Sequence, residues 1–279
     1  MAGRDVGKLI VNDDSLYTSL WRRWLQPLES VKENSSPPLD IAQLEMEIEL
    51  AVSGTDVKFR KAILTTVKAA LSSALQTLES DFAIHNDGAV YVGRHTWIMD
   101  LLVSFIVAQA GKRFRLDGKK HRMAVVAVGG YGRGELAPFS DIDILFLMSE
   151  TQALEIEKTI EFSLYLLWDL GLKVGHATRT VRETIDTAKA DQTVQTGLLE
   201  MRKICGHQQL YRQLESAVAA IVSKTKTSDF VEQKLIERDQ RHARLGATRY
   251  VVEPNIKDGK GGLRDLHTLF WIIKFAYRS

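Results

Sequence analysis

Two aspartates, Asp141 and Asp143, stand two positions apart where an apolar segment, Ile142–Met148, begins. In an extended chain, alternate residues point to the same face, so both carboxylates would leave a strand on one side. Carboxylate oxygens on one face are a ligand set for a hard cation such as Mg²⁺. The spacing therefore predicts a metal site at these two aspartates. The alternative is a solvated strand end, which is the commoner role of an isolated Asp-x-Asp.

A glycine pair, Gly129 and Gly130, follows a second apolar and β-branched segment, residues 123–128. Without Cβ atoms, these glycines would let a phosphate approach the backbone and accept hydrogen bonds from N–H groups. The pattern predicts a strand, a glycine turn, a short helical turn and a second strand. A dinucleotide fingerprint is excluded, because Pro138 and a new strand follow the glycines where that motif requires a long helix.

The combination of the Gly-Gly turn, Gly-Glu-Leu at residues 134–136 and Ser-Asp-x-Asp at residues 140–143 resembles the polymerase-β-type nucleotidyltransferase superfamily. The resemblance implies that Gly129 and Gly130 cradle a triphosphate. It also implies that the aspartates hold Mg²⁺, with Mn²⁺ as the alternative cation. Two further residues are expected to contact the phosphates, Ser140 by hydrogen bonding and Arg133 through its charge.

A second motif occupies residues 253–265 and reads Glu-Pro-Asn-Ile-Lys-Asp-Gly-Lys-Gly-Gly-Leu-Arg-Asp. Such a turn, dense in charge at the start of an apolar helical stripe, suits ligand contact. We therefore expect Lys257 and Arg264 to bind the nucleotide, with a plain surface turn as the alternative. Taken with the first motif, this stretch resembles the amino-terminal part of the bifunctional uridylyltransferase/uridylyl-removing enzymes, from about Val125 to the end of the chain.

That resemblance implies transfer of UMP from the substrate UTP to a tyrosine hydroxyl of the nitrogen-regulatory protein PII in bacteria. It also implies a later HD phosphohydrolase domain, which removes UMP, and two ACT domains. The sequence contains no His-Asp dipeptide and stops within a helical pattern, so we expect a truncated chain without uridylyl-removing activity. Two alternatives stay open: a non-catalytic nucleotide-binding regulatory module, and nucleotidyl transfer to a different acceptor.

A third candidate strand, residues 172–180, contains no acid, although the superfamily often takes a third metal carboxylate from a neighbouring strand. By alternation, Val174, His176 and Thr178 share one face. If that face looks toward the aspartates, His176 takes the place of the missing acid and could act as a general base toward tyrosine. The alternative is a histidine hydrogen-bonded in a packed strand.

The elements that must position these residues are a few strands among many helices. We predict an α/β (α+β) fold, with the small mixed sheet of the nucleotidyltransferase fold flanked by mostly helical N- and C-terminal regions. The expected divisions are a helical region over 1–120, a nucleotidyltransferase core over 121–190 and a helical domain over 191–279. Apolar stripes indicate the early helices: Leu16, Leu20, Trp24 and Leu28 in one, and Ile63, Val67, Ala70, Leu71, Ala74 and Leu78 in another.

The composition is that of an ordinary globular chain, with 279 residues, 45% hydrophobic and 26% charged. A net charge of +2 gives no sign of a nucleic-acid partner. The first residues lack the apolar core of a signal peptide, and no apolar run approaches the roughly 18 residues of a membrane helix. The single Cys205, expected in a helix over 194–205, cannot form an intramolecular disulfide. These features predict a cytoplasmic protein without a membrane partner.

Overall fold

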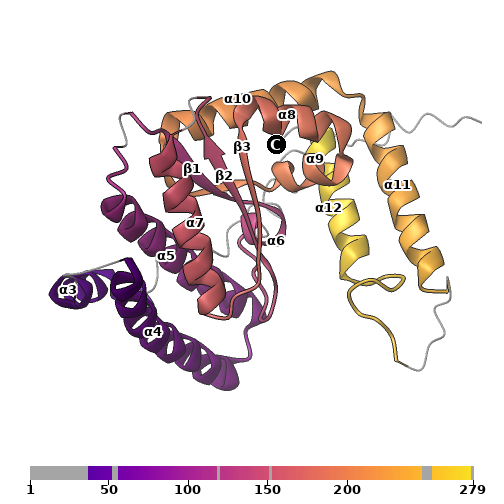
Figure 1. Ribbon diagram of the computed structural model, residues 1–279. Coiled ribbons are helices and arrows are strands. Elements are labelled where there is room, and N and C mark those ends of the chain that lie inside the picture. The colour runs from indigo at the N-terminus through magenta and orange to yellow at the C-terminus, as the bar shows by residue number, and fades with distance from the viewer. Residues whose placement is uncertain (1–36, 52–55, 118–119, 151–152, 247–252, 278–279) are drawn as a thin grey trace, which may run out of the picture. The chain divides into compact units, whose positions relative to one another are not determined.

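The computed structural model describes residues 37–51, 56–117, 120–150, 153–246 and 253–277 (Figure 1). The predicted stripe from Leu16 to Leu28 lies outside these residues. The chain divides into two compact units. The first holds the described residues up to 106, with residues 133–140 and 166–173, and the second holds residues 107–132, 141–165 and the described residues from 174 onward. The predicted divisions at residues 120 and 190 stay predictions.

Long helices build the first unit. They are α3 (Ile41–Ala51), α4 (Asp56–His85) and the first part of α5 (Gly88–Arg113). The predicted stripe of α4 is confirmed, since Ile63, Val67 and Leu71 recur at helical spacing and are all buried. Among the described residues, α5 is the one helix whose length and composition would allow it to cross a membrane. Because 67% of its apolar stretch is buried inside the fold, α5 has the burial of a core helix.

Two neighbouring side chains of α5 hold the loop at residues 133–140. The buried His95 has Nδ1 2.8 Å from the carbonyl oxygen of Leu136, so this ring nitrogen is the donor. The amide of Leu136 in turn donates to Oγ1 of Thr96 at 3.0 Å. Both backbone groups of Leu136 are thus satisfied by side chains, as buried polar groups require.

His95 should make the stability of this unit depend on pH. Burial lowers the pKa of His95, and the hydrogen bond to Leu136 opposes this only in part. The unfolded chain would therefore take up a proton near pH 6.5, while the folded chain stays neutral to lower pH. The stability that depends on a neutral His95 is fully present above about pH 6.5. It is lost as the pH falls toward the lower pKa that His95 has in the folded chain. Thermal unfolding between pH 5 and 8 measures this loss.

The matched comparison is His95→Gln against His85→Gln, because His85 is exposed at the end of α4. The His95 variant should show a weaker pH dependence than the wild type, and the His85 variant an unchanged one. The same loss of stability below pH 6.5 in both variants would contradict the assignment to His95.

The second unit is built on a four-stranded sheet in the order β3-β2-β1-β4. Its strands are β1 (Met123–Ala127), β2 (Ile142–Met148), β3 (Val174–Thr180) and β4 (Arg202–Gly206). β1 runs antiparallel to β2 and β4, whereas β2 and β3 are parallel, so the predicted mixed sheet is confirmed. β1 is buried along its whole length, in keeping with its apolar and β-branched composition.

The helices of the second unit lie between the strands or after β4 along the chain. They are α6 (Gly129–Gly132), α7 (Leu154–Asp169), α8 (Val181–Ala190), α9 (Gln192–Leu199), α10 (Gln208–Lys224), α11 (Thr227–Arg244) and α12 (Leu263–Tyr277). α7 extends into the first unit at Leu166. α11 and α12 lie side by side (Figure 1).

One predicted element is wrong. The helix expected over 194–205 ends at Leu199, and Cys205 lies in β4, opposite Val125 of β1. The segment Arg202–Gly206 fills the free edge of β1, where backbone hydrogen bonds are available on the side away from β2. Strand formation there depends on this pairing rather than on local preference, which is why the region after residue 190 is not wholly helical.

Candidate active site

The carboxylate of Asp143 lies between two glycines. Gly175 of β3 is directly opposite Asp143 in the parallel pairing, and a Cβ atom on Gly175 would collide with Oδ1 of Asp143. On the other side, a Cβ atom on Gly129 would come within 3.6 Å of Oδ2. The amide of Val128 donates to the carbonyl oxygen of Asp143 at 3.1 Å, which fixes the glycine turn beside the aspartate. Small residues on both sides leave this carboxylate open.

The predicted pairing of the two aspartates is consistent with the electrostatics of Asp143. Both side chains are exposed, whereas Ile142 between them is buried. The pKa of Asp143 is raised, first by desolvation from the chain around it and then by the negative charge of Asp141. Arg264 acts in the opposite direction and lowers the pKa. A carboxylate whose pKa is raised by a neighbouring negative charge is at a place that a cation would stabilise.

The acid pair fits a cation that brings other ligands with it. Within the described ranges, no group of three or more His, Cys, Asp or Glu side chains could hold a metal ion. Mg²⁺ is commonly bound through one or two carboxylates, with waters and substrate phosphates completing its shell. The donor set of Asp141 and Asp143, next to a glycine turn suited to phosphate, matches that arrangement.

The predicted place of His176 is wrong. In the parallel pairing, His176 is opposite Ile144, and Gly175 is opposite Asp143. Residues opposite each other on neighbouring strands point to the same face, so His176 points to the face away from the Asp143 carboxylate. Alternation correctly grouped the residues of β3, but only the register decides which group faces the aspartates. His176 is therefore not positioned as a base beside the acid pair.

The glycine turn that follows β1 is a single helical turn, α6. Gly129 has φ +59°, a left-handed conformation that favours glycine, whereas Gly130 has no positive φ. At the far end of the turn, the carbonyl oxygen of Glu200 lies where a Cβ atom of Gly132 would be. Arg202 of β4 donates to the carbonyl oxygen of Gly132 at 3.3 Å. The turn is thus held at its far end by the Arg202 side chain and by close packing against the backbone of Glu200.

The second motif forms a compact loop before α12. Oδ1 of Asn255 accepts hydrogen bonds from the amides of Lys257 at 3.0 Å and Asp258 at 2.9 Å. The amide of Arg264 donates to the carbonyl oxygen of Lys257 at 2.9 Å, which joins the loop to the first turn of the helix. The Arg264 side chain, with Nε 3.7 Å from Oδ1 of Asp258, is the basic group that acts on Asp143.

Arg133, Ser140 and Lys257 were also predicted to bind the nucleotide. Arg133 is 10% exposed and its Nε lies 2.9 Å from Oε2 of Glu135, so its charge is shared with a carboxylate of the same loop. Ser140 is exposed, and its amide donates to the carbonyl oxygen of Ala137 at 3.2 Å. The side chain of Lys257 is exposed. Contacts of these three residues with a nucleotide stay predictions.

The structure adds two residues that the sequence patterns did not indicate. Gly175 faces Asp143 from the next strand, and Arg202 holds the carbonyl end of the glycine turn. Lys-Val-Gly-His in the sequence gives no sign that the glycine rather than the histidine faces the acids. The contact of Arg202 with the glycine turn was not predicted, because its segment was assigned to a helix.

A Cβ atom at Gly175 should damage the acid pair without unfolding the sheet. In Gly175→Ala, the new methyl group would displace the Asp143 carboxylate, while β3 is an edge strand and the position is exposed. A displacement of about 1 Å in a reacting group can cost about 10²-fold in rate. We expect a loss of nucleotidyl transfer on the order of 10²-fold, measured as kcat/KM, with thermal stability nearly unchanged. The matched control is His176→Gln on the opposite face, which should keep near wild-type kinetics; the reverse ranking would contradict this placement.

Two family models match separate parts of this chain. Residues 112–198 match the family model described as a nucleotidyltransferase domain. Residues 229–279 match a second family model, described as GlnD PII-uridylyltransferase. The two matches contain the two motifs in turn.

A curated relative gives the particular likeness. The chain is 42% identical over 261 residues to a bifunctional uridylyltransferase/uridylyl-removing enzyme from Bradyrhizobium sp. strain BTAi1. The alignment covers 90% of this chain and 28% of the relative, and the resemblance predicted from the two motifs is confirmed. Among solved structures, one described as a toxin-antitoxin with AMP-PNP aligns with 51% of this chain and 94% of its own, at 16% identity. Its TM-score of 0.25 is too low to support any inference.

Proposed function

We propose that this chain transfers UMP from UTP to a tyrosine hydroxyl of the PII signalling protein. The observation that supports this most directly is the open carboxylate pair beside the glycine turn, in a chain 42% identical to a uridylyltransferase. The chain spans 28% of that relative's length, so the relative's activity, substrate and partner enter here as a proposal. We also propose a bacterial, cytoplasmic setting in nitrogen regulation.

In this reaction the tyrosine oxygen forms a bond to the α-phosphorus, and the bond from that phosphorus to pyrophosphate breaks. Asp141 and Asp143 would hold Mg²⁺, or Mn²⁺ in its place, and the bound ion would neutralise charge at the phosphates. The glycine turn would place backbone N–H groups against the triphosphate. Arg264 would add a positive charge on the side of the acid pair. Together these groups orient the nucleotide and stabilise the charge that develops on it.

The test is incubation of the chain with PII and α-labelled UTP, ATP, GTP or CTP, with Mg²⁺, with Mn²⁺ or with a chelator. We expect label on one tyrosine of PII, from UTP in preference to the other nucleotides. In reactions that contain the chelator, PII should carry no label. A PII variant with phenylalanine at the acceptor position is the control. UTP binding without transfer would favour a non-catalytic regulatory module, and label on another added protein would favour a different acceptor.

The Bradyrhizobium relative is also a uridylyl-removing enzyme. We do not extend that activity to this chain, because the 279 residues contain no His-Asp dipeptide. Uridylyl-PII incubated with the chain under the same conditions is therefore expected to keep its UMP.

A further inference from the structure

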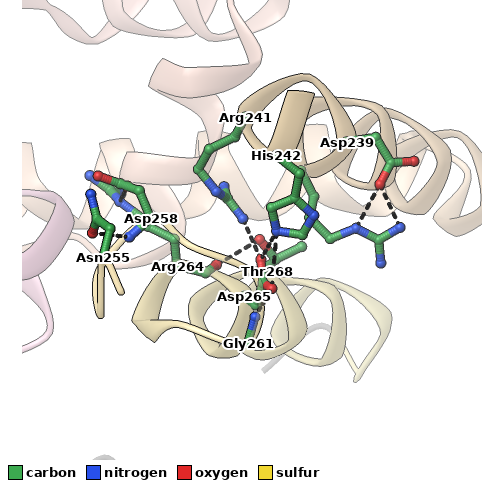
Figure 2. A network of polar contacts seen from close by, with 10 residues as sticks. Asp239, Arg241, His242, Asn255, Asp258, Gly261, Arg264, Asp265 and Thr268 are labelled. Atoms are coloured by element: carbon green, nitrogen blue, oxygen red, sulfur yellow. Dashed lines mark hydrogen bonds and ion pairs between the residues drawn. The ribbon is translucent and has the colours of Figure 1, made fainter. Parts of the chain in front are cut away.

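The carboxylate of Asp265 joins three parts of the second unit (Figure 2). Oδ1 accepts a hydrogen bond from Nη2 of Arg241 at 2.6 Å, and Nε2 of His242 lies 3.0 Å from the same oxygen. Oδ2 accepts from the amide of Gly261 at 2.7 Å. α11, the loop at residues 253–262 and the first turn of α12 therefore converge on the Asp265 side chain.

Asp265 is held as an anion in this position. Burial alone would raise the pKa of Asp265, but the hydrogen bonds from Gly261, Arg241 and His242 outweigh it, and the pKa is lowered. The side chain is 21% exposed, Arg241 15% and His242 11%, so the contacts are largely shielded from solvent. Charge-assisted hydrogen bonds in such surroundings are stronger and more selective in geometry than those between neutral groups.

The loop next to Asp265 has little freedom to rearrange. The amide of Gly259 donates to the carbonyl oxygen of Asn255 at 2.9 Å, and that of Gly262 to the carbonyl oxygen of Gly259 at 2.9 Å. Cβ atoms at Gly259 and Gly262 would fall within 3.0 Å of backbone oxygens of the same loop. Gly261 has φ +78°, a conformation that glycine adopts readily. The hydrogen bond from Gly261 to Asp265 therefore fixes the whole loop and not one residue alone.

A second anchor, two turns along α12, places the helix beside the glycine turn of α6. Nε1 of Trp271 donates to Oε1 of Glu200 at 2.6 Å in a buried contact, and Nζ of Lys234 lies 5.0 Å from the Trp271 ring centroid. The backbone of Glu200 packs against Gly132. These contacts hold α12 next to Glu200, which packs against the glycine turn that borders Asp143 at Gly129.

We propose that Asp265 is a positioning residue, whose hydrogen bonds to Gly261, Arg241 and His242 hold the adjacent Arg264 toward Asp141 and Asp143. The proposal rests on the proposed function, since it assigns Arg264 to the nucleotide. The position of Arg264 depends on such support because its ion pair with Asp258 is long, at 3.7 Å, and its side chain is 41% exposed. A long, flexible cation contributes most to recognition when its backbone is already fixed.

The test is a double-mutant cycle on kcat and KM for UTP, with Asp265→Asn, Arg264→Ala and the double variant. Asparagine keeps the size of Asp265 but replaces one acceptor oxygen with a donor group, so it loses part of the network. We expect Asp265→Asn to lower kcat/KM for UTP by about 10-fold to 10²-fold, the scale of a misplaced group. In the Arg264→Ala background the same change should have little further effect, because the group that it positions is gone.

The matched control is Asp239→Asn, the same change on α11. Asp239 is 66% exposed, accepts from Arg238 at 2.8 Å and lies away from the loop (Figure 2). This variant should keep wild-type kinetics. Arg241→Lys, which weakens one bond of the network, provides a second variant should Asp265→Asn not fold, and is expected to show the same dependence on Arg264.

The outcomes separate this inference from the proposed function. Absence of UMP transfer in the wild type would overturn the function itself. An active wild type whose Asp265→Asn variant has unchanged kinetics would overturn the positioning role alone. Losses from Asp265→Asn and Arg264→Ala that add fully would also overturn it, since an independent structural effect does not depend on Arg264.

Discussion

Replacement of Asp143 with asparagine should lower UMP transfer by roughly three orders of magnitude or more while the chain stays folded. A metal clamp contributes several kcal/mol to charge stabilisation, and each 1.36 kcal/mol corresponds to about tenfold in rate. Asparagine retains the size of the side chain but removes the charge that a cation needs. The measurement is kcat/KM for UTP, with circular dichroism to establish that the fold is intact. The control is Asp186→Asn, an exposed carboxylate of α8 that pairs with Lys189.

The same variant should be as stable as the wild type, or more stable, in buffer without divalent cations. Because the pKa of Asp143 is raised in the folded chain, the folded state keeps this proton to a higher pH than the unfolded state. The associated stability is greatest at low pH and is lost as the pH rises from the unfolded value, near 3.9, through the folded one. At neutral pH the charge therefore opposes folding, and asparagine removes that cost. Normal turnover by the folded variant would show that the acid pair is not the metal site.

Replacement of Arg264 with alanine should lower kcat/KM for UTP by about 10²-fold to 10³-fold, the scale for removing one preorganised group that stabilises developing charge. The stability of the variant should change little, since the ion pair of Arg264 with Asp258 is long and partly exposed, and such pairs contribute little. Arg264→Lys should recover part of the loss, because a lysine supplies the charge without the planar pair of donors.

The control for this prediction is Arg238→Ala. Arg238 has a similar exposure of 36% and pairs with the neighbouring Asp239 on α11, outside the loop. Initial rates over a range of UTP concentrations separate weaker binding from slower chemistry. Equal losses in the two arginine variants would mean that Arg264 acts through general charge and not through a specific effect on the acid pair.

The sequence determined the local chemistry of this protein. The limits of β2 at Ile142 and Met148 follow from an apolar run bounded by polar residues, and β1 begins at the predicted Met123. The stripe of α4 follows from its helical period, and the single helical turn after β1 was predicted from the glycine pair there. These features depend on neighbours within a few residues, which the sequence contains directly. The two motifs were also enough to predict the likeness to a uridylyltransferase.

The tertiary structure alone decided which residues surround the acid pair. A strand pattern tells which residues share a face, but a shift of one residue in register reverses the face, and so Gly175 and not His176 lies against Asp143. β4 formed where a helix was predicted, because its stability comes from pairing with β1. The influence of Arg264 on Asp143 joins positions that are far apart in the sequence. No local pattern encodes such contacts; they arise when separate elements pack together.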